Sequence, residues 1–139
     1  MSTDITKIAF DFFDACETGK GWQVCQAYCT DSASFSAQTD ALADISTLEG
    51  YVGWMQGLLV TLPDGNYELK SFATDTERSI VVATAIFRGT HTGEGGPVPP
   101  TNQRAEADYA YVMEFDGDRI SHMTKIWNDQ ITLRQLGWA

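Results

Sequence analysis

The spacing of apolar residues changes near the middle of this chain, and that change restricts the fold class. Between Ile5 and Cys16, apolar side chains recur three and four residues apart, as on one face of an α-helix. From Tyr67 onward they alternate with polar side chains, as on a β-strand with one buried face. Helices followed by a run of strands are typical of an α+β domain.

The first half of the chain carries residues that favour helix ends. Ser2 or Thr3 is available to cap the first helix, and Gly19 to close it. A short helix is expected over residues 22–28 and a brief strand over residues 33–36.

A third helix is expected over residues 48–62. Ser46 and Glu49 have the spacing of a capping box, in which both side chains satisfy free amides at a helix start. The pattern stops at Pro63, which cannot continue a helix.

The second half reads as strands joined by short turns, rich in β-branched and aromatic residues. We expect a curved sheet, mixed or antiparallel, wrapped as a cone over three N-terminal helices in one domain spanning residues 1–139. A final helix is predicted over residues 130–136, closed by Gly137. The predicted strands are residues 67–74, 79–90, 104–115 and 119–128.

The last predicted hairpin decides which side chains face the interior of the cone. If Gly117 and Asp118 form a two-residue turn, Phe115 lies opposite Ile120 and the register of the two strands is fixed. On this register Lys125 and Asp108 lie diagonally on the other face and can form an ion pair. The further inward pairs are Met113 with His122, Tyr111 with Thr124 and Tyr109 with Ile126. The other face then holds Asp108, Ala110, Val112, Met123, Lys125 and Trp127. A one-residue change of register would exchange the two sets, and the first register is preferred because it pairs Phe115 with Ile120.

Charge and composition exclude some partners. Nine Lys and Arg residues against nineteen Asp and Glu residues give a net charge of −10, which disfavours nucleic acid and anionic membrane surfaces. The first fifteen residues contain no continuous apolar segment typical of a secretory signal. No later stretch approaches the roughly 20 apolar residues of a membrane span. We therefore expect a cytoplasmic protein.

No cofactor or metal is expected from the motifs. Cys25 and Cys29 lie four residues apart, so on a helix they share a face, either as two metal ligands or as small buried apolar groups. No further Cys or His clusters near them in the sequence, and a zinc site needs more ligands. Phosphate-binding glycine loops, a nucleophile elbow and the HExxH motif are also missing.

The C-terminal half resembles a known family. The segments concerned are residues 89–94 and 96–101, the hairpin 112–120, His122, Trp127 and the terminal Gln135-Leu136-Gly137. Together these segments resemble the SnoaL-like polyketide cyclase group of the nuclear-transport-factor-2-like superfamily.

The resemblance implies a cone-shaped α+β fold with an internal pocket, and a homodimer formed through the sheet. It also implies cofactor-free chemistry, with a histidine and an aspartate two residues apart on the last strand closing a ring by an aldol-type reaction. The histidine maps to His122, but Thr124 stands where the aspartate would be. A threonine hydroxyl does not exchange protons usefully near neutral pH.

Three polar residues are candidates for the chemistry, and two of them have an alternative role. His122 titrates in the right range to act as a base or acid, or it is a buried neutral imidazole. Asp129 could replace the missing acid, or it caps the last helix. Thr124, beside them on the last strand, could orient a substrate carbonyl.

Further residues are candidates for binding a substrate. Tyr109 and Tyr111 could donate to a substrate carbonyl, or simply pack in the strand. Met113 belongs to the same predicted inward face, and Trp54 could close one end of the cavity or pack in the core. His91 begins a Gly/Pro-rich segment and is expected to be exposed, with a possible role at the pocket mouth.

These residues predict a cofactor-independent enzyme that binds a small apolar molecule bearing a carbonyl group. The reaction would be proton abstraction beside the carbonyl, followed by ring closure, isomerisation or elimination. The alternative is a non-catalytic ligand-binding or dimeric interaction module, and a purely structural dimer would have a cone filled by side chains.

Overall fold

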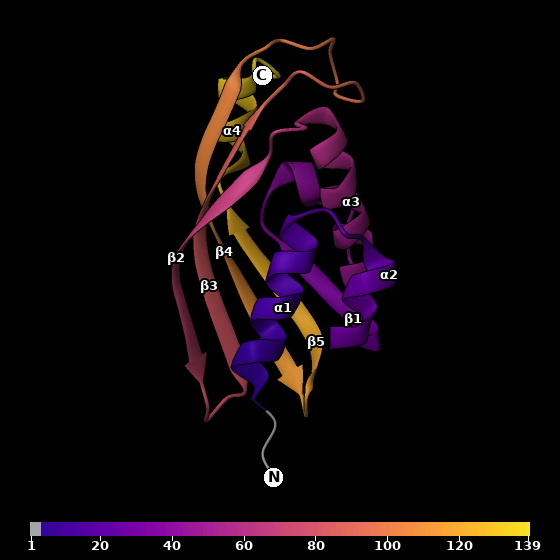
Figure 1. Cartoon of the computed structure of the whole chain (residues 1–139), viewed down its shortest axis with the longest axis vertical. Coiled ribbons are helices and arrows are strands. Elements are labelled where there is room, and N and C mark those ends of the chain that lie inside the picture. The colour runs from indigo at the N-terminus through magenta and orange to yellow at the C-terminus, as the bar shows by residue number, and fades with distance from the viewer. Residues whose placement is uncertain (1–3) are drawn as a thin grey trace.

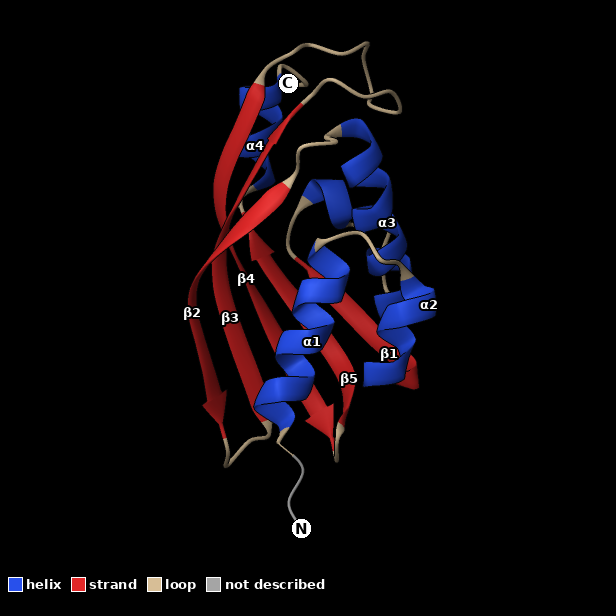
Figure 2. Ribbon diagram, viewed as in Figure 1, coloured by secondary structure: helices blue, strands red, loops and turns tan. Residues whose placement is uncertain are grey.

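The computed structural model describes residues 4–139 and shows an α+β fold, as predicted (Figure 1). A curved, unclosed sheet carries helices on one side, while a last helix lies near one end of the sheet (Figure 2). The helices are α1 (Ile5–Glu17), α2 (Trp22–Cys25), α3 (Leu48–Thr61) and α4 (Asp129–Leu136), with 3₁₀ turns at Gln26–Tyr28 and Asp40–Leu42. The strands are β1 (Cys29–Ala37), β2 (Asn66–Asp75), β3 (Ile80–Thr90), β4 (Arg104–Asp116) and β5 (Arg119–Trp127).

The sheet is mixed, with strand order β1-β5-β4-β3-β2. The strands β2 to β5 form an antiparallel meander, and β1 adds to the edge of β5 in parallel. The brief strand predicted at residues 33–36 is therefore longer, because it pairs with β5 over much of its length. In the part of the chain that the structure describes, no helix is long and apolar enough to cross a membrane.

Helix α1 packs its apolar stripe against the sheet. Asp4 caps this helix by accepting the backbone N–H of Thr6 at 3.0 Å, whereas the predicted caps Ser2 and Thr3 lie outside the described residues. Phe12 and Phe13 are fully buried, as the helical spacing indicates. Glu17, the last residue of α1, continues this stripe and is buried as well.

Helix α3 begins one residue later than the capping-box prediction requires. Thr47 is the N-cap and accepts the backbone N–H of Gly50 at 3.0 Å, so the assignment of this role to Ser46 is wrong. The helix buries Tyr51 and Met55 against the core, and it ends at Thr61, just before Pro63.

A β-bulge in β5 changes the predicted register of the last hairpin. Phe115 pairs with Ile120 as expected, but the next pair is Glu114 with His122, which leaves Ser121 as an extra residue. Because side chains alternate, one extra residue exchanges the two faces of β5 beyond it. The observed pairs continue as Met113 with Met123, Val112 with Thr124, Tyr111 with Lys125, Ala110 with Ile126 and Tyr109 with Trp127.

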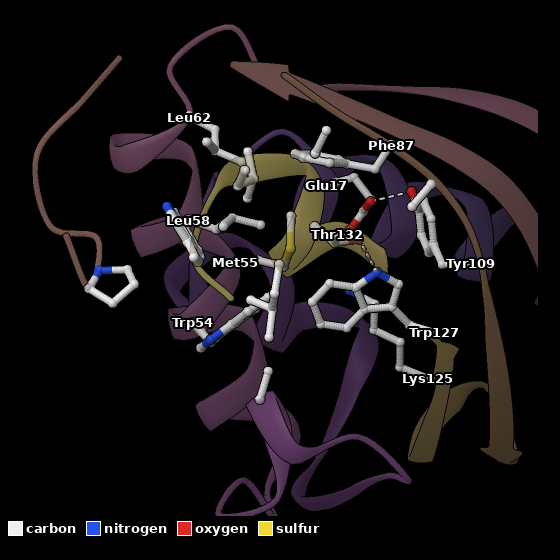
Figure 3. Close-up of a pocket in the computed structure, with 17 residues that line it drawn as sticks. Glu17, Trp54, Met55, Leu58, Leu62, Phe87, Tyr109, Lys125, Trp127 and Thr132 are labelled. Atoms are coloured by element: carbon white, nitrogen blue, oxygen red, sulfur yellow. Dashed lines mark hydrogen bonds between the residues drawn. The ribbon is translucent and has the colours of Figure 1, made fainter. Parts of the chain in front are cut away.

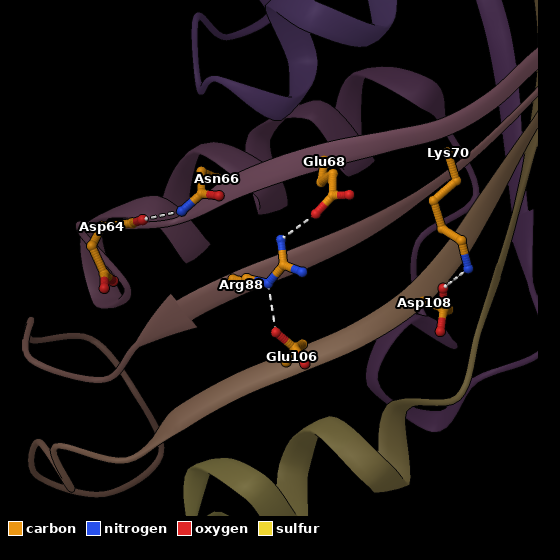
Figure 4. Close-up of polar contacts among 7 residues, drawn as sticks. All are labelled: Asp64, Asn66, Glu68, Lys70, Arg88, Glu106 and Asp108. Carbon is orange, nitrogen blue, oxygen red and sulfur yellow. Dashed lines mark hydrogen bonds and ion pairs between the residues drawn. The ribbon is translucent and has the colours of Figure 1, made fainter.

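The outer face of the sheet carries ion pairs in contact with water (Figure 4). Arg88 binds Glu68 at 2.8 Å and Glu106 at 2.5 Å across three neighbouring strands. Asp108 pairs with Lys70 at 2.8 Å, so the predicted ion pair between Asp108 and Lys125 is wrong. Lys125 instead points to the inner side, where only 6% of it is exposed.

Candidate functional site

A cavity of about 180 Å³ lies between the inner face of the sheet, α3 and α4. Side chains of α3 form one wall, and Glu17, Tyr109, Lys125 and Trp127 lie on the other (Figure 3). The lining is mainly apolar, so the few polar groups in it stand in a water-poor environment. The lining residues are Glu17, Ala41, Trp54, Met55, Leu58, Leu62, Phe87, Pro97, Ala105, Ala107, Tyr109, Lys125, Trp127, Thr132, Leu133, Leu136 and Trp138.

The acidic group of this wall is Glu17, at the last turn of α1. Its side chain is 1% exposed, and its two carboxylate oxygens accept hydrogen bonds from the hydroxyls of Tyr109 and Tyr111. Burial raises the pKa of the Glu17 carboxyl, and the charge of Lys125 together with the two phenols opposes the rise. The carboxylate is therefore a stronger base than one in water.

The basic group is Lys125 on β5. Its Nζ donates to the hydroxyl of Tyr51 at 3.0 Å. It lies 4.6 Å from the ring centroid of Trp127, and between 5.1 and 5.3 Å from those of Tyr51, Trp54 and Tyr109. These distances allow cation–π attraction to the ammonium form.

Burial nevertheless lowers the pKa of the Lys125 ammonium from 10.5 to about 8, against the attraction of Glu17 and Cys16. An amine with such a pKa is present in both protonation states near neutral pH. Lys125 is therefore able to donate or accept a proton inside the cavity wall.

Hydrogen bonds connect the two charged groups through two phenols. The Tyr51 hydroxyl, which accepts from Lys125, lies 2.7 Å from the Tyr111 hydroxyl, and Tyr111 in turn donates to Glu17. Tyr51 and Tyr111 are both fully buried, and burial raises the pKa of each hydroxyl well above 10. The chain Lys125–Tyr51–Tyr111–Glu17 is a continuous path for protons beneath the cavity.

Four predicted binding residues lie on the inner side of the fold. Trp54 and Tyr109 line the cavity. Tyr111 is fully buried behind the lining, where it contacts Glu17, Tyr51 and the Cys16 sulfur. Met113 is also fully buried, and it belongs to the core and not to the cavity wall.

His122 and Thr124 do not face the cavity. The bulge places both on the opposite side of β5, where His122 Nδ1 lies 2.7 Å from the Ser34 hydroxyl and Nε2 lies 3.0 Å from that of Ser36. Thr124 bonds to the same Ser36 hydroxyl at 3.2 Å. The predicted shared position of His122 and Tyr111 beside a cavity is therefore wrong, because the register used for it lacked the bulge.

Asp129 lies at the first turn of α4 but does not cap it. Asn128 is the N-cap residue, so the predicted capping role is displaced by one position. The Asp129 carboxylate is 6% exposed and accepts the backbone N–H of Ala41 at 2.9 Å. It thus holds the segment before α3 against α4 and does not line the cavity.

His91 is buried, contrary to the exposure expected for the Gly/Pro-rich segment. Its Nδ1 accepts hydrogen bonds from the Trp138 indole at 3.0 Å and from the Thr101 amide at 3.3 Å. Pro97 of the same segment and Trp138 line the cavity, whereas His91 stands behind them. His91 therefore fastens the segment to the C-terminus.

The residues that sequence reasoning missed are Glu17 and Lys125. Glu17 lies four residues after Phe13, so it continues the buried stripe of α1. A charged residue on a buried stripe marks a candidate functional position. Lys125 alternates with Met123 and Trp127, so it shares their face, but the missing bulge assigned that face to the outside. Both residues were visible as charges within apolar patterns.

The structure groups no set of metal ligands within residues 4–139. Cys16, Cys25 and Cys29 are buried free thiols there, and the Cys29 thiol donates to the carbonyl of Cys25 at 3.5 Å. The ionisable side chains in the cavity lining are those of Glu17, Tyr109 and Lys125.

Solved structures of similar shape support the fold. IdmH of Streptomyces antibioticus, described as a candidate polyketide cyclase, superposes with a TM-score of 0.79 at 20% identity, covering 97% of this chain and 99% of that one. AclR of Streptomyces galilaeus, described as a candidate hydroxylase, gives 0.77 at 18% identity, covering 97% and 85%. A ketosteroid-isomerase-like protein of Catenulispora acidiphila, solved with trimethylamine, gives 0.69 at 14% identity, covering 100% and 96%.

These neighbours differ in the activity ascribed to them, so the shared fold does not select a reaction. No curated protein matches this sequence. Residues 7–136, however, match the SnoaL-like polyketide cyclase family, which confirms the resemblance seen in the C-terminal half. The chain belongs to the SnoaL-like polyketide cyclase family.

Proposed function

We propose that this protein catalyses proton transfer beside a carbonyl group of a small apolar molecule bound in the cavity. The observation that supports this function is the presence of a buried carboxylate, Glu17, and a buried amine, Lys125, in one wall of an otherwise apolar cavity. Charged side chains are rarely fully buried unless they are paired, and ionisable groups with shifted pKa values cluster at functional sites. Ring closure of the polyketide-cyclase type, isomerisation and elimination all begin with this proton transfer.

Glu17 serves as the base in this proposal. Its two oxygens each accept one phenol hydrogen bond, and a carboxylate has about four acceptor positions, so capacity remains for a substrate proton. Burial raises its pKa and thereby its basicity toward a carbon acid. Lys125, as an ammonium group, stabilises the negative charge that develops on the carbonyl oxygen.

The cavity favours a ligand with one aromatic ring. Its volume of about 180 Å³ is comparable to an engineered apolar cavity of about 150 Å³ that holds benzene. Trp54, Trp127 and Phe87 offer aromatic surfaces to such a ring. An aryl ketone with a short side chain is therefore a suitable probe of the activity.

The test is deuterium exchange of the methylene protons of phenylacetone in D₂O, followed by proton NMR. Wild-type protein should exceed the buffer rate, and Glu17→Gln should lower the excess by about 10²- to 10⁴-fold, the usual contribution of a general base. Glu106→Gln, which removes a carboxylate from the outer face, is the matched control and should keep the full rate. A Glu17→Gln protein that exchanges as fast as wild type would refute the role of Glu17.

Non-catalytic ligand binding is the second candidate. It is favoured by the way Glu17, Tyr109, Tyr111, Tyr51 and Lys125 satisfy one another by hydrogen bonds or charge. Quenching of the fluorescence of Trp54 and Trp127 by phenylacetone reports binding independently of exchange. Saturable quenching with exchange at the buffer rate would select this candidate and reject the enzyme.

A further inference from the structure

Lys125 combines three features that set a lysine apart as a nucleophile. It lines an apolar cavity, its Nζ lies among four aromatic rings, and its amine is linked by hydrogen bonds to a buried carboxylate. To stabilise negative charge on a carbonyl oxygen, Lys125 would need only its ammonium form. The hydrogen-bonded path to Glu17 offers more, because it can take up the proton that an ammonium must lose before it attacks a carbonyl.

We propose that Lys125 forms a covalent imine with the carbonyl carbon of a small aryl ketone or aldehyde bound in the cavity. This inference rests on the proposed function, since it names how the carbonyl is activated there. The ligand class follows from the cavity, which has an apolar aromatic lining and one amine.

The reaction balances with the groups present. The Lys125 ammonium passes a proton along Tyr51 and Tyr111 to Glu17, and the neutral amine then attacks the carbonyl carbon, so that a C–N bond forms and the C=O π pair moves to oxygen. Proton transfer from nitrogen to that oxygen gives a carbinolamine. With a proton returned from Glu17, the carbinolamine expels water as the nitrogen lone pair forms the C=N bond, which yields a protonated imine.

The imine makes the neighbouring C–H more acidic than the ketone does, because its cationic nitrogen receives the electron pair left behind. Glu17, deprotonated again, faces the same cavity and removes that proton to give an enamine. The carboxylate thus serves both steps, first as proton store and then as base toward carbon.

The protonation state of Lys125 agrees with this role. With its pKa lowered to about 8, roughly half of the amines are neutral at pH 8, against fewer than about one in a hundred for an ordinary lysine. Desolvation in an apolar pocket is a known way to activate a lysine toward carbonyl compounds. The chain contains four lysines, so Lys7, Lys20 and Lys70 serve as internal controls for Lys125.

The experiment traps the imine with sodium cyanoborohydride in the presence of phenylacetone at pH 8, and locates the added mass by peptide mapping. We expect the Lys125 peptide to be modified about tenfold or more above the Lys70 peptide, because Lys125 lines the cavity that would hold the ligand and Lys70 does not. Lys70→Arg should leave the adduct unchanged, and Lys125→Arg should remove it. Equal modification of all lysines, or an adduct that persists in Lys125→Arg, would overturn the inference.

A second variant tests the proton path. Tyr51→Phe removes the hydroxyl that links Lys125 to Tyr111 while keeping the ring stacked against Phe35. Trapping should become slower and its pH profile should shift upward, whereas fluorescence quenching by phenylacetone should be unchanged. Unchanged trapping and pH profile in a folded Tyr51→Phe protein would overturn the path.

Measuring exchange and trapping on the same ligand separates this inference from the proposed function. Deuterium exchange that depends on Glu17 without an adduct at Lys125 would retain the proposed function and reject the imine. An adduct at Lys125 without exchange would retain the imine and reject the removal of the carbon-bound proton by Glu17. Circular dichroism of each variant establishes that it is folded before either result is used.

Discussion

Two groups of charged residues lie on opposite faces of the same sheet and behave differently. On the outer face Arg88 joins Glu68 and Glu106, whose side chains are 61% and 52% exposed. On the inner face Glu17 and Lys125 are almost completely buried. The hydrogen bond from Arg88 lowers the pKa of Glu106, whereas burial raises that of Glu17. On the outer face water stabilises the charged form of these side chains, and in the interior the lack of water destabilises it.

The two faces differ in how readily their charged groups change protonation state. An exposed ion pair is screened by water and salt, and its members keep one protonation state across the neutral range. A buried carboxylate and amine are each shifted toward the neutral form, so proton exchange between them costs little. The same residue types therefore keep a fixed charge on the outer face and have shifted pKa values on the inner face.

The largest effect is expected when the inner pair is broken. Glu17 and Lys125 share no direct ion pair and are joined through the hydroxyls of Tyr51 and Tyr111. Glu17→Gln removes the negative charge that favours the Lys125 ammonium and weakens the phenol hydrogen bonds, so we expect the free energy of unfolding at pH 7 to fall by about 1.5–3 kcal/mol. Chemical denaturation measures this loss. Combining Glu17→Gln with Lys125→Met should recover most of it, because no unpaired charge then remains buried. If Glu17→Gln is as stable as wild type, the charge of Glu17 does not stabilise the Lys125 ammonium.

An intermediate effect is expected in the pH dependence of stability. The folded-state pKa of Lys125, about 8, is below its unfolded value of 10.5, so the unfolded chain binds more protons between them and stability rises with pH. Relative to Lys125→Met, wild type should gain roughly 1.5 kcal/mol of unfolding free energy from pH 8 to pH 9.5. Denaturation of both proteins at the two pH values measures this gain, and parallel pH profiles would show that Lys125 is not desolvated.

The outer pair should give the smallest effect. Arg88→Met removes both ion pairs of this residue, but its partners stay hydrated, so the unfolding midpoint in moderate salt should be unchanged. The exchange of phenylacetone protons should also be unchanged. A clear loss of stability in thermal denaturation would mean that this cluster holds the sheet together and that the contrast with the inner pair is weaker than described.

Much of the fold could be predicted from the sequence. The spacing of Phe12, Phe13 and Cys16 predicted α1, and the alternation after residue 66 predicted β2 to β5 within one or two residues at their ends. These patterns are local, since each reflects one apolar side of one element. Helix caps were predicted less well, because Ser46 competes with Thr47 at the start of α3 and Asp129 with Asn128 at the start of α4, and backbone geometry selects one of each pair.

The candidate site was predicted less well, for a reason that lies in one residue. Ser121 is the extra residue in β5, and nothing local distinguishes it from its neighbours as a bulge. The bulge keeps both Ile120 and Met123 buried, which a regular strand could not do for residues three apart. Placing His122 in the cavity followed from assuming a regular strand.

By itself, the sequence determined the order of helices and strands, the family, and an interior rich in aromatic residues. Those features follow from local hydrophobic periodicity and from residue types that any pairing of the strands would keep. Only the tertiary structure decided that Glu17 and Lys125, 108 positions apart, share one cavity wall while His122 lies outside. That outcome depends on strand register, and register is set by how all the buried side chains fit together.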